Sequence, residues 1–250
     1  MAGVRKINDV GSVEKSAVSI LSRAVEHDKN KRYTYAIVCY QEGIQLLLEA
    51  LKETTNDTKK KHLRQKASDY MDRAEQMKKL VQKEKEAGTY HEQIHINNNE
   101  SGYSYEKVFG PFLEDSVTRI EVEDPYIRTI HQTHNFLRFC ELLVKRCPDL
   151  QEIMLLTGRE EHEPTAQEKR FTQLTESLKK HKIVLTVKYS MTLHDREIRL
   201  DNFWVIKIGR GLDFFKAAEN KFSIGFCDMS LRPCYETTID IFHRKSIKRD

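Results

Sequence analysis

Residues 61–86 constrain the fold of this chain more than any other stretch. Within them, apolar or small side chains recur at alternating intervals of four and three residues, which puts them on one face of an α-helix. The set comprises Leu63, Ala67, Tyr70, Ala74, Met77 and Val81. The spacing therefore predicts a long helix with one buried stripe.

Met71 does not belong to this stripe. It follows Tyr70 and lies about 100° further around the helix, where its neighbours at turn spacing are Ala67, Ala74 and Glu75. An apolar side chain among small residues and an acid offers what a second helix needs in order to dock. We therefore predict a helix-binding surface centred on Met71. The alternative is that Met71 only rests against helices of its own domain.

Two more helices are expected before this one. Residues 13–24 and 33–51 show the same apolar spacing, and polar segments at residues 28–31 and 54–57 interrupt it. Because short connections between long helices make neighbours antiparallel, the pattern predicts an up-down-up three-helix bundle over residues 10–88.

The pattern changes after the bundle. Residues 89–103 are polar and lack helical periodicity, so we predict a mobile linker there. Residues 104–250 then alternate short apolar strands with helices, which is typical of an α/β layered domain. The expected strands are residues 117–122, 153–156, 183–189, 203–208 and 237–242, with helices over residues 127–147 and around residues 171–178. The predicted fold class is thus α + α/β, a three-helix bundle followed by an α/β domain.

Composition excludes several classes of protein. A net charge of +4 over 250 residues is low for a nucleic-acid binder. Apolar runs are only a few residues long and the first ten residues lack a signal core, so we expect a cytoplasmic protein without a membrane span. Five cysteines without a CxxC pair predict reduced, buried thiols rather than zinc ligands. We expect no metal and no cofactor.

The first half resembles the MIT (microtubule interacting and trafficking) domain. The resemblance covers roughly residues 10–86 and depends on residues 24–29, 36–41 and 66–80, of which residues 70–75 (YMDRAE) are the most specific. In that family a groove between the second and third helices binds an amphipathic helix at the C-terminus of ESCRT-III subunits. The resemblance therefore implies ESCRT-III subunits, the charged multivesicular body proteins and their relatives, as partners.

The resemblance also implies which side chains make the contact. Met71 occupies the position of the pocket residue for a peptide leucine, and Glu75 that of the acid which meets a peptide arginine. The candidate peptide-binding residues are Ala67, Met71, Asp72, Ala74, Glu75 and Lys78. Asp72 and Lys78 are weaker candidates, because charged helix positions are usually solvated. Burying Met71 against a partner should contribute about 1.5–3 kcal/mol, in keeping with micromolar affinity.

The second half resembles the phospholipase D-like domain that follows the MIT domain in some proteins. The segments that carry this resemblance are residues 123–128, 135–140, 194–199, 206–213, 231–234, 236–238 and 240–242. It implies a dimerising domain that associates with phosphoinositide-containing membrane, in a protein of cytokinetic abscission. The implied locations are the midbody and the late endosome membrane.

Catalysis is weighed on the phospholipase D pattern, His-x-Lys followed by Asp. His194, Arg196 and Asp201 have this spacing, with arginine in place of lysine. A working site needs a nucleophilic histidine, a cation on the phosphate and a second histidine for the leaving group. His131 and His134 have neither a cation nor an acid at the required spacing, although a dimer could supply a second copy. We predict anion binding without turnover and assign no catalytic residue; a local ion pair is the simpler alternative.

Membrane binding would depend on cations in the second half. Each cation near an anionic bilayer contributes about 1 kcal/mol, so four on one face would give weak recruitment. The predicted anion- or membrane-binding residues are Lys179, Lys180, Lys182, His194, Arg196, Arg199, Lys207, Arg210 and Arg232, with a further cluster at residues 244–249. Residues 209–211 (GRG) could bring backbone N–H groups to a phosphate. The alternative is that these are ordinary solvated side chains.

Together these features predict an adaptor that couples ESCRT-III C-terminal helices to anionic membrane. The competing predictions are a dimeric phosphodiesterase of the phospholipase D type, delivered by an MIT domain, and a scaffold without lipid affinity.

Overall fold

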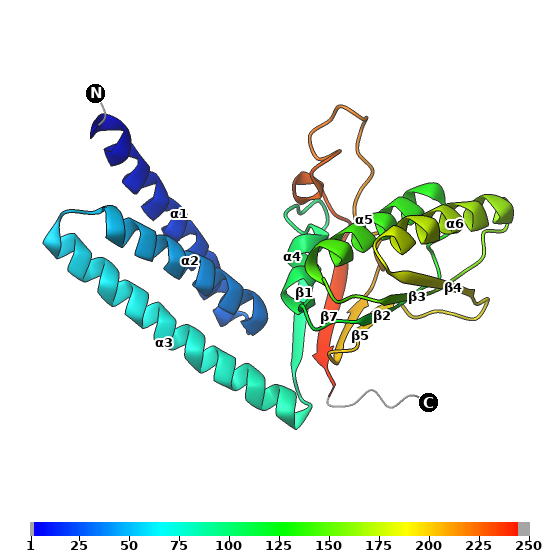
Figure 1. Cartoon of the computed structure of the whole chain (residues 1–250), viewed down its shortest axis with the longest axis horizontal. Coiled ribbons are helices and arrows are strands. Elements are labelled where there is room, and N and C mark those ends of the chain that lie inside the picture. Colours follow the sequence, from blue (N-terminus) through cyan, green and yellow to red (C-terminus); the bar gives the residue numbers. More distant parts are fainter. Residues whose placement is uncertain (1–2, 245–250) are drawn as a thin grey trace. The chain divides into compact units, whose positions relative to one another are not determined.

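The structure, a computed structural model, describes residues 3–244, with side chains from residue 12 onward. Its chain divides into two compact units, residues 1–92 and 93–250. Figure 1 shows the three helices of the first unit and the sheet and helices of the second. The cation cluster expected at residues 244–249 lies, apart from Arg244, outside the described residues.

The first unit contains three long helices, as the periodicity predicts. They are α1 (Gly3–Lys29), α2 (Tyr33–Glu53) and α3 (Asp57–Ala87). Asn56 begins α3 as its N-cap, since its side chain accepts a hydrogen bond from the Lys59 amide at 3.0 Å. The predicted stripe of α3 is buried except for Tyr70, which is half-buried.

A bidentate ion pair joins the end of α1 to α3. The Arg73 guanidinium donates to both carboxylate oxygens of Asp28, at 2.6 and 2.7 Å. Tyr40 of α2 donates to the same carboxylate at 3.3 Å. The Arg73 hydrogen bonds lower the pKa of Asp28 below its ordinary value, while burial raises the pKa of Tyr40 to about 12.

The segment predicted as a mobile linker contains a strand instead. Strand β1 (His91–Ile96) forms one edge of the sheet, next to β7 (Thr237–His243). Its burial alternates strictly, with Glu92, Ile94 and Ile96 buried. The linker prediction was wrong here because exposed histidines and a glutamine separate the buried residues, so the segment reads as polar although its period is two.

Buried polar groups surround the start of this strand within the first unit. Tyr90 is buried and donates a hydrogen bond to the Glu92 carboxylate. The Thr34 hydroxyl of α2 lies 2.6 Å from the Tyr90 hydroxyl. Burial raises the pKa of Glu92 to about 7, so this carboxyl group holds its proton far more strongly than an exposed glutamate does.

The second unit is built on a seven-stranded mixed sheet of order β1-β7-β6-β5-β2-β3-β4. Strands β2, β3 and β4 run parallel, joined by crossover helices, and β5, β6 and β7 continue the sheet antiparallel. The bounds are β2 Arg119–Asp124, α5 Ile130–Arg146, β3 Glu152–Thr157, α6 Pro164–Lys180, β4 Val184–Tyr189, β5 Glu197–Leu200 and β6 Trp204–Ile208, with the short helices α4 Tyr105–Phe109, Gly110–Phe112 and Met229–Leu231. The mixed α/β domain is confirmed, although sequence reasoning did not predict β5 or α4.

Helices and sheet enclose an aromatic core. Phe136 and Phe139 of α5 are fully buried, as are Phe109 of α4 and Trp204 of β6. Figure 1 shows α5 and α6 together on one side of the sheet. Three cysteines (Cys140, Cys147 and Cys234) are buried as expected, but Cys227 is exposed on a loop.

The other side of the sheet carries charged side chains that pair across strands. Arg199 of β5 bonds Glu123 of β2 at 2.8 Å and also contacts Glu197, which Lys207 of β6 approaches at 3.3 Å. Glu123 and Glu197 are cross-strand partners, so their carboxylates would repel each other. The ion pairs with Arg199 and Lys207 offset this repulsion. No helix in the described residues is long and apolar enough to cross a membrane.

Candidate functional site

The predicted peptide-binding residues lie on one stretch of α3. Met71 is 43% exposed although it is a large apolar side chain, and Asp72, Glu75 and Lys78 are exposed around it. Ala67 and Ala74 lie at turn spacing from Met71 on the same helix, but both are buried in the bundle core. An exposed methionine above small side chains, with an acid one turn further on, can accept a leucine and an arginine of a docking helix.

A hollow of the bundle lies elsewhere on its surface. A groove of about 520 Å³ runs between α1 and α3, and its lining includes the apolar residues Val18, Leu21, Leu63 and Tyr70. Val18 is 62% exposed there. Met71 is not among the lining residues, because it lies one position past Tyr70 and therefore faces away from α1. The described part of the bundle thus has, besides the surface around Met71, an apolar groove that sequence reasoning did not identify.

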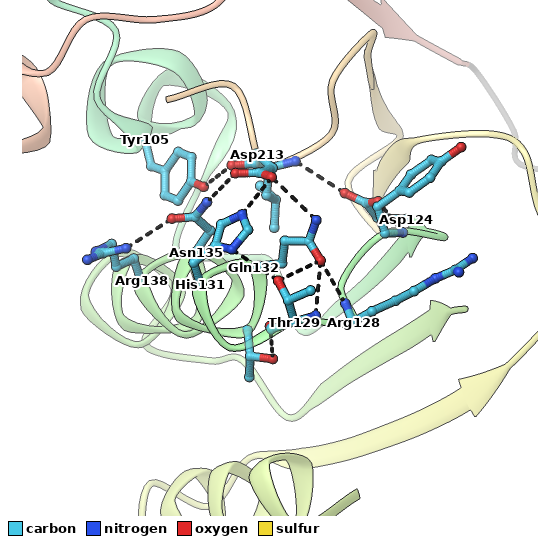
Figure 2. Close-up of polar contacts among 12 residues, drawn as sticks. Tyr105, Asp124, Arg128, Thr129, His131, Gln132, Asn135, Arg138 and Asp213 are labelled. Atoms are coloured by element: carbon cyan, nitrogen blue, oxygen red, sulfur yellow. Dashed lines mark hydrogen bonds and ion pairs between the residues drawn. The ribbon is translucent and has the colours of Figure 1, made fainter. Parts of the chain in front are cut away.

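In the second unit, polar side chains gather where the parallel strands end, which we call the carboxyl edge of the sheet. Figure 2 shows Asp213 as the centre of this network. Its carboxylate accepts hydrogen bonds from Asn135 Nδ2 at 3.0 Å and Gln132 Nε2 at 3.4 Å, and it lies 3.1 Å from His131 Nε2. All three partners come from the first turns of α5, so a loop residue after β6 is fixed to the start of a helix.

A second carboxylate, that of Asp124, binds the backbone of the same loop after β6. Asp124, at the end of β2, is buried and accepts hydrogen bonds from the amides of Tyr126 at 3.0 Å and Leu212 at 3.3 Å. Burial raises its pKa above the ordinary value. Gly211 passes so close that an added Cβ would lie 2.0 Å from the Asp124 carboxylate, and its φ of +60° also favours glycine.

Two predicted anion-binding cations lie at this edge. The Arg196 guanidinium stacks 4.2 Å from the centre of the Tyr126 ring and donates to the Gly209 carbonyl. Arg210 is exposed and stacks 4.3 Å from the Tyr235 ring. Both guanidinium groups are therefore held in place by aromatic rings. His194 is exposed on the loop before β5.

The glycine pair of residues 209–211 does not form the predicted phosphate cradle. The Gly209 amide donates to the Thr238 carbonyl and the Gly211 amide to the Ile208 carbonyl, each at 3.0 Å. Both glycine N–H groups are therefore used inside the domain and cannot receive a phosphate. The Arg210 side chain is exposed beside them.

The spacing of His194, Arg196 and Asp201 does not produce a site. Strand β5 lies between Arg196 and Asp201, which separates them by about 16 Å along the chain direction. The Asp201 carboxylate instead accepts hydrogen bonds from the Thr118 hydroxyl at 2.5 Å and the Arg119 amide at 3.0 Å, at the opposite edge of the sheet. It caps the start of β2, so the phospholipase D spacing in the sequence does not bring Asp201 to His194 and Arg196.

His131, by contrast, does have an acid partner. Sequence reasoning gave it none, because Asp213 lies 82 residues later in the chain. Its other ring nitrogen is 3.0 Å from the Thr129 hydroxyl, so the imidazole is held from both sides (Figure 2). An oriented histidine of this kind can transfer protons. The described residues contain no group of three or more potential metal ligands.

The remaining predicted cations do not join this edge. Lys179 and Lys180 end α6 and Lys182 precedes β4, so all three are exposed at the opposite edge of the sheet. Arg199 and Lys207 lie on the sheet face, paired with acids. Arg232 is buried and donates to the carbonyls of Gly225 and Phe226. We therefore leave Arg199, Lys207 and Arg232 out of the proposed membrane surface.

Comparisons with known proteins agree with this division of the chain. Residues 14–79 match the MIT (microtubule interacting and transport) domain, and residues 102–243 match the phospholipase D-like domain at the C-terminus of MIT. MIT domain-containing protein 1 of Mus musculus is 52% identical over 235 residues, which cover 94% of each chain. The chain therefore belongs to the family of proteins that join an N-terminal MIT domain to a C-terminal phospholipase D-like domain.

Proposed function

We propose that this protein is an adaptor that binds C-terminal helices of ESCRT-III subunits through its MIT domain and anionic membrane through its second domain. The observation that carries the proposal is the 43% exposure of Met71 on α3, inside the segment that matches the MIT domain. A large apolar side chain, exposed next to small residues and Glu75, can pack against the apolar face of an amphipathic helix.

The contact should be weak by itself. One methionine buried against a leucine contributes about 1.5–3 kcal/mol, and the surrounding charges add little because they are solvated. Micromolar affinity follows from such a contact. A second contact, with membrane, would raise the overall affinity through the effective concentration of the two surfaces.

The peptide surface is tested by calorimetric titration of the full chain with synthetic C-terminal helices of ESCRT-III subunits. We expect micromolar binding that Met71→Asp abolishes. Val18→Asp is the matched control, because Val18 is also an exposed apolar side chain, in the groove between α1 and α3. Loss of binding in the Val18 variant alone would move the peptide site to that groove, and no binding by the natural chain would reject the ESCRT-III assignment.

Membrane association is supported by the ring-stacked cations Arg196 and Arg210 at the carboxyl edge. Flotation with phosphatidylcholine vesicles, with and without phosphatidylserine or a phosphoinositide, measures it directly. Arg196→Gln/Arg210→Gln should weaken binding to anionic vesicles, whereas Lys179→Gln/Lys180→Gln at the opposite edge should not. Equal losses in both variants would indicate diffuse charge attraction instead of one binding edge.

We propose that the protein acts in cytokinetic abscission, reaches the midbody and late endosome membrane from the cytoplasm, and pairs with a second copy through its second domain. Tagged Met71→Asp should fail to reach the midbody in dividing cells. Light scattering of the purified chain would report the mass of a dimer.

The competing function is phosphodiester hydrolysis, and the pairing of His131 with Asp213 is the observation that favours it. We propose that the domain lacks this activity, because the displacement of Asp201 removes the expected phospholipase D arrangement. Hydrolysis of bis(p-nitrophenyl) phosphate, abolished by His131→Ala but retained by Asp201→Asn, would overturn this view. Absence of turnover in the natural chain would agree with it.

A further inference from the structure

The loop between β6 and β7 carries exposed apolar side chains at its tip. Phe222 is 98% exposed and Ile224 is 85% exposed, and Leu231 is 53% exposed nearby. Figure 1 shows this segment, in orange, extending away from the sheet. Residues 217–232, which we call the apolar loop, thus present large apolar groups to solvent where a polar tip would be the rule.

Hydrogen bonds order the backbone of the apolar loop. Its base is closed by the bridge between Phe215 and Cys234 and by a hydrogen bond from the Lys216 amide to the Pro233 carbonyl at 2.9 Å. Above the base, buried Arg232 donates to the carbonyls of Gly225 at 2.7 Å and Phe226 at 2.6 Å. These bonds fix the neck of the loop.

The backbone at the tip is also specified. Asn220 accepts a hydrogen bond from the Phe222 amide at 2.8 Å, and the Ser223 hydroxyl bonds the Asn220 carbonyl at 2.8 Å. Gly225 has a φ of +87°, which favours glycine. A Cβ added to Gly225 would lie 3.2 Å from the backbone carbonyl of Leu231. The loop therefore holds Phe222 and Ile224 outward. A flexible segment, by contrast, could fold these side chains back onto the domain.

Cations and an aromatic ring surround the base of the loop. Arg210 and Lys216 lie over the Tyr235 ring at 4.3 and 5.3 Å, and Tyr235 is 38% exposed. Lys221 is exposed directly beside Phe222. Apolar side chains at a tip, with a tyrosine and basic side chains behind them, match the layers of a bilayer from acyl chain to interface to headgroup.

We infer that the apolar loop inserts Phe222 and Ile224 into an anionic bilayer, an inference that rests on the proposed membrane association of the second domain. A convex tip suits a fluid bilayer, which needs no preformed groove to receive it. Glu219 and Asp228 are exposed on the same loop and oppose the attraction of its one lysine, Lys221. Insertion of apolar groups, which salt does not screen, is therefore the main contribution of the loop, while Arg196 and Arg210 supply the part that salt screens.

The first test is vesicle sedimentation of the full chain with phosphatidylcholine/phosphatidylserine vesicles at 0.1 M and 0.5 M NaCl, where the Debye length is about 10 Å and about 4 Å. Phe222→Ser/Ile224→Ser should lower the partition coefficient at least about tenfold at both salt concentrations. The matched control is Val184→Ser, because Val184 is 60% exposed at the start of β4, at the opposite edge of the sheet. Both variants change exposed side chains, and the fluorescence of buried Trp204 checks that the domain remains folded.

The second test reports insertion itself. Phe222→Trp should show a blue-shifted emission and quenching by brominated phosphatidylcholine, whereas the natural chain should not, because its single tryptophan is buried. If the natural chain binds vesicles but the serine variant binds equally well, or the new tryptophan is not quenched, the loop inference is overturned and the membrane proposal stands. If the natural chain binds no vesicle, both are overturned, and the apolar loop would then have to contact a protein.

Discussion

The two domains fill their interiors in different ways. The MIT bundle uses small side chains where its helices meet, among them Ala17, Ala24, Ala36 and Ala50, each almost fully buried. The second domain instead fills the space between helices and sheet with aromatic rings. Small residues let helices approach closely and leave little volume between them. Met71 is a large apolar side chain of the bundle that stays 43% exposed.

The domains also differ in how they assemble a surface. The residues around Met71 all belong to one helix, so helical periodicity alone brings them together. The carboxyl edge brings together Asp124 of β2, His131 and Asn135 of α5, and Asp213 of the loop after β6. A surface on one helix should therefore tolerate single substitutions without loss of fold, whereas the carboxyl edge should be sensitive to the loop geometry that holds it.

The largest effect should follow from Gly211→Ala. The new methyl group would meet the buried Asp124 carboxylate and would require a φ that alanine adopts poorly, so we expect a loss of about 3–5 kcal/mol in the free energy of unfolding. Trp204 fluorescence in urea reports the second domain selectively. Gly209→Ala is the control, since its added Cβ would come no closer than 3.1 Å to the Thr237 hydroxyl. Equal stability of the two variants would contradict this account of the edge.

A smaller effect is expected from the protonation of Glu92. Because its pKa is raised to about 7, the folded chain binds this proton more tightly than the unfolded chain. Stability from this group is then fully present below about pH 4.5 and is lost as the pH rises through 7, by about 3 kcal/mol in total.

Glu92→Gln should flatten this pH dependence, because glutamine stays neutral throughout. Thermal unfolding at pH 4.5, 6 and 7.5 would measure the change, with Glu75→Gln as the exposed control that keeps the natural slope. An unchanged slope in the Glu92 variant would show that burial of this carboxyl group does not govern the pH response.

The smallest effect should come from Asp28→Asn in the bundle. It removes the ionic partner of Arg73, but Arg73 is about half exposed, so the expected loss is about 1–2 kcal/mol. The pKa of Asp28 is lowered in the folded state, so the natural pair stabilises the bundle above about pH 4 and its contribution is lost as the pH falls below that. Far-UV circular dichroism during urea unfolding should show a difference between the chains that is smaller at pH 3 than at pH 7.

Sequence reasoning succeeded where one period determines the structure. The stripe of α3 predicted its buried residues, and the apolar runs predicted most strands of the sheet. It failed at β1, where Glu92 occupies a buried position and disguises the alternation. The phospholipase D spacing of Arg196 and Asp201 could not say where the two side chains lie, because β5 runs between them and separates its two ends. The pairing of His131 with Asp213 could not be predicted, because it depends on the register of the whole sheet.

The most direct test of the account is whether the protein carries an ESCRT-III helix to a membrane. A fluorescent C-terminal ESCRT-III peptide is mixed with anionic vesicles and the full chain, and the peptide that sediments with the vesicles is measured. We predict that the peptide sediments only when the chain is present, and that either Met71→Asp or Phe222→Ser/Ile224→Ser abolishes this. If the chain binds peptide and vesicles separately but never together, the two surfaces are not coupled and the adaptor account is contradicted.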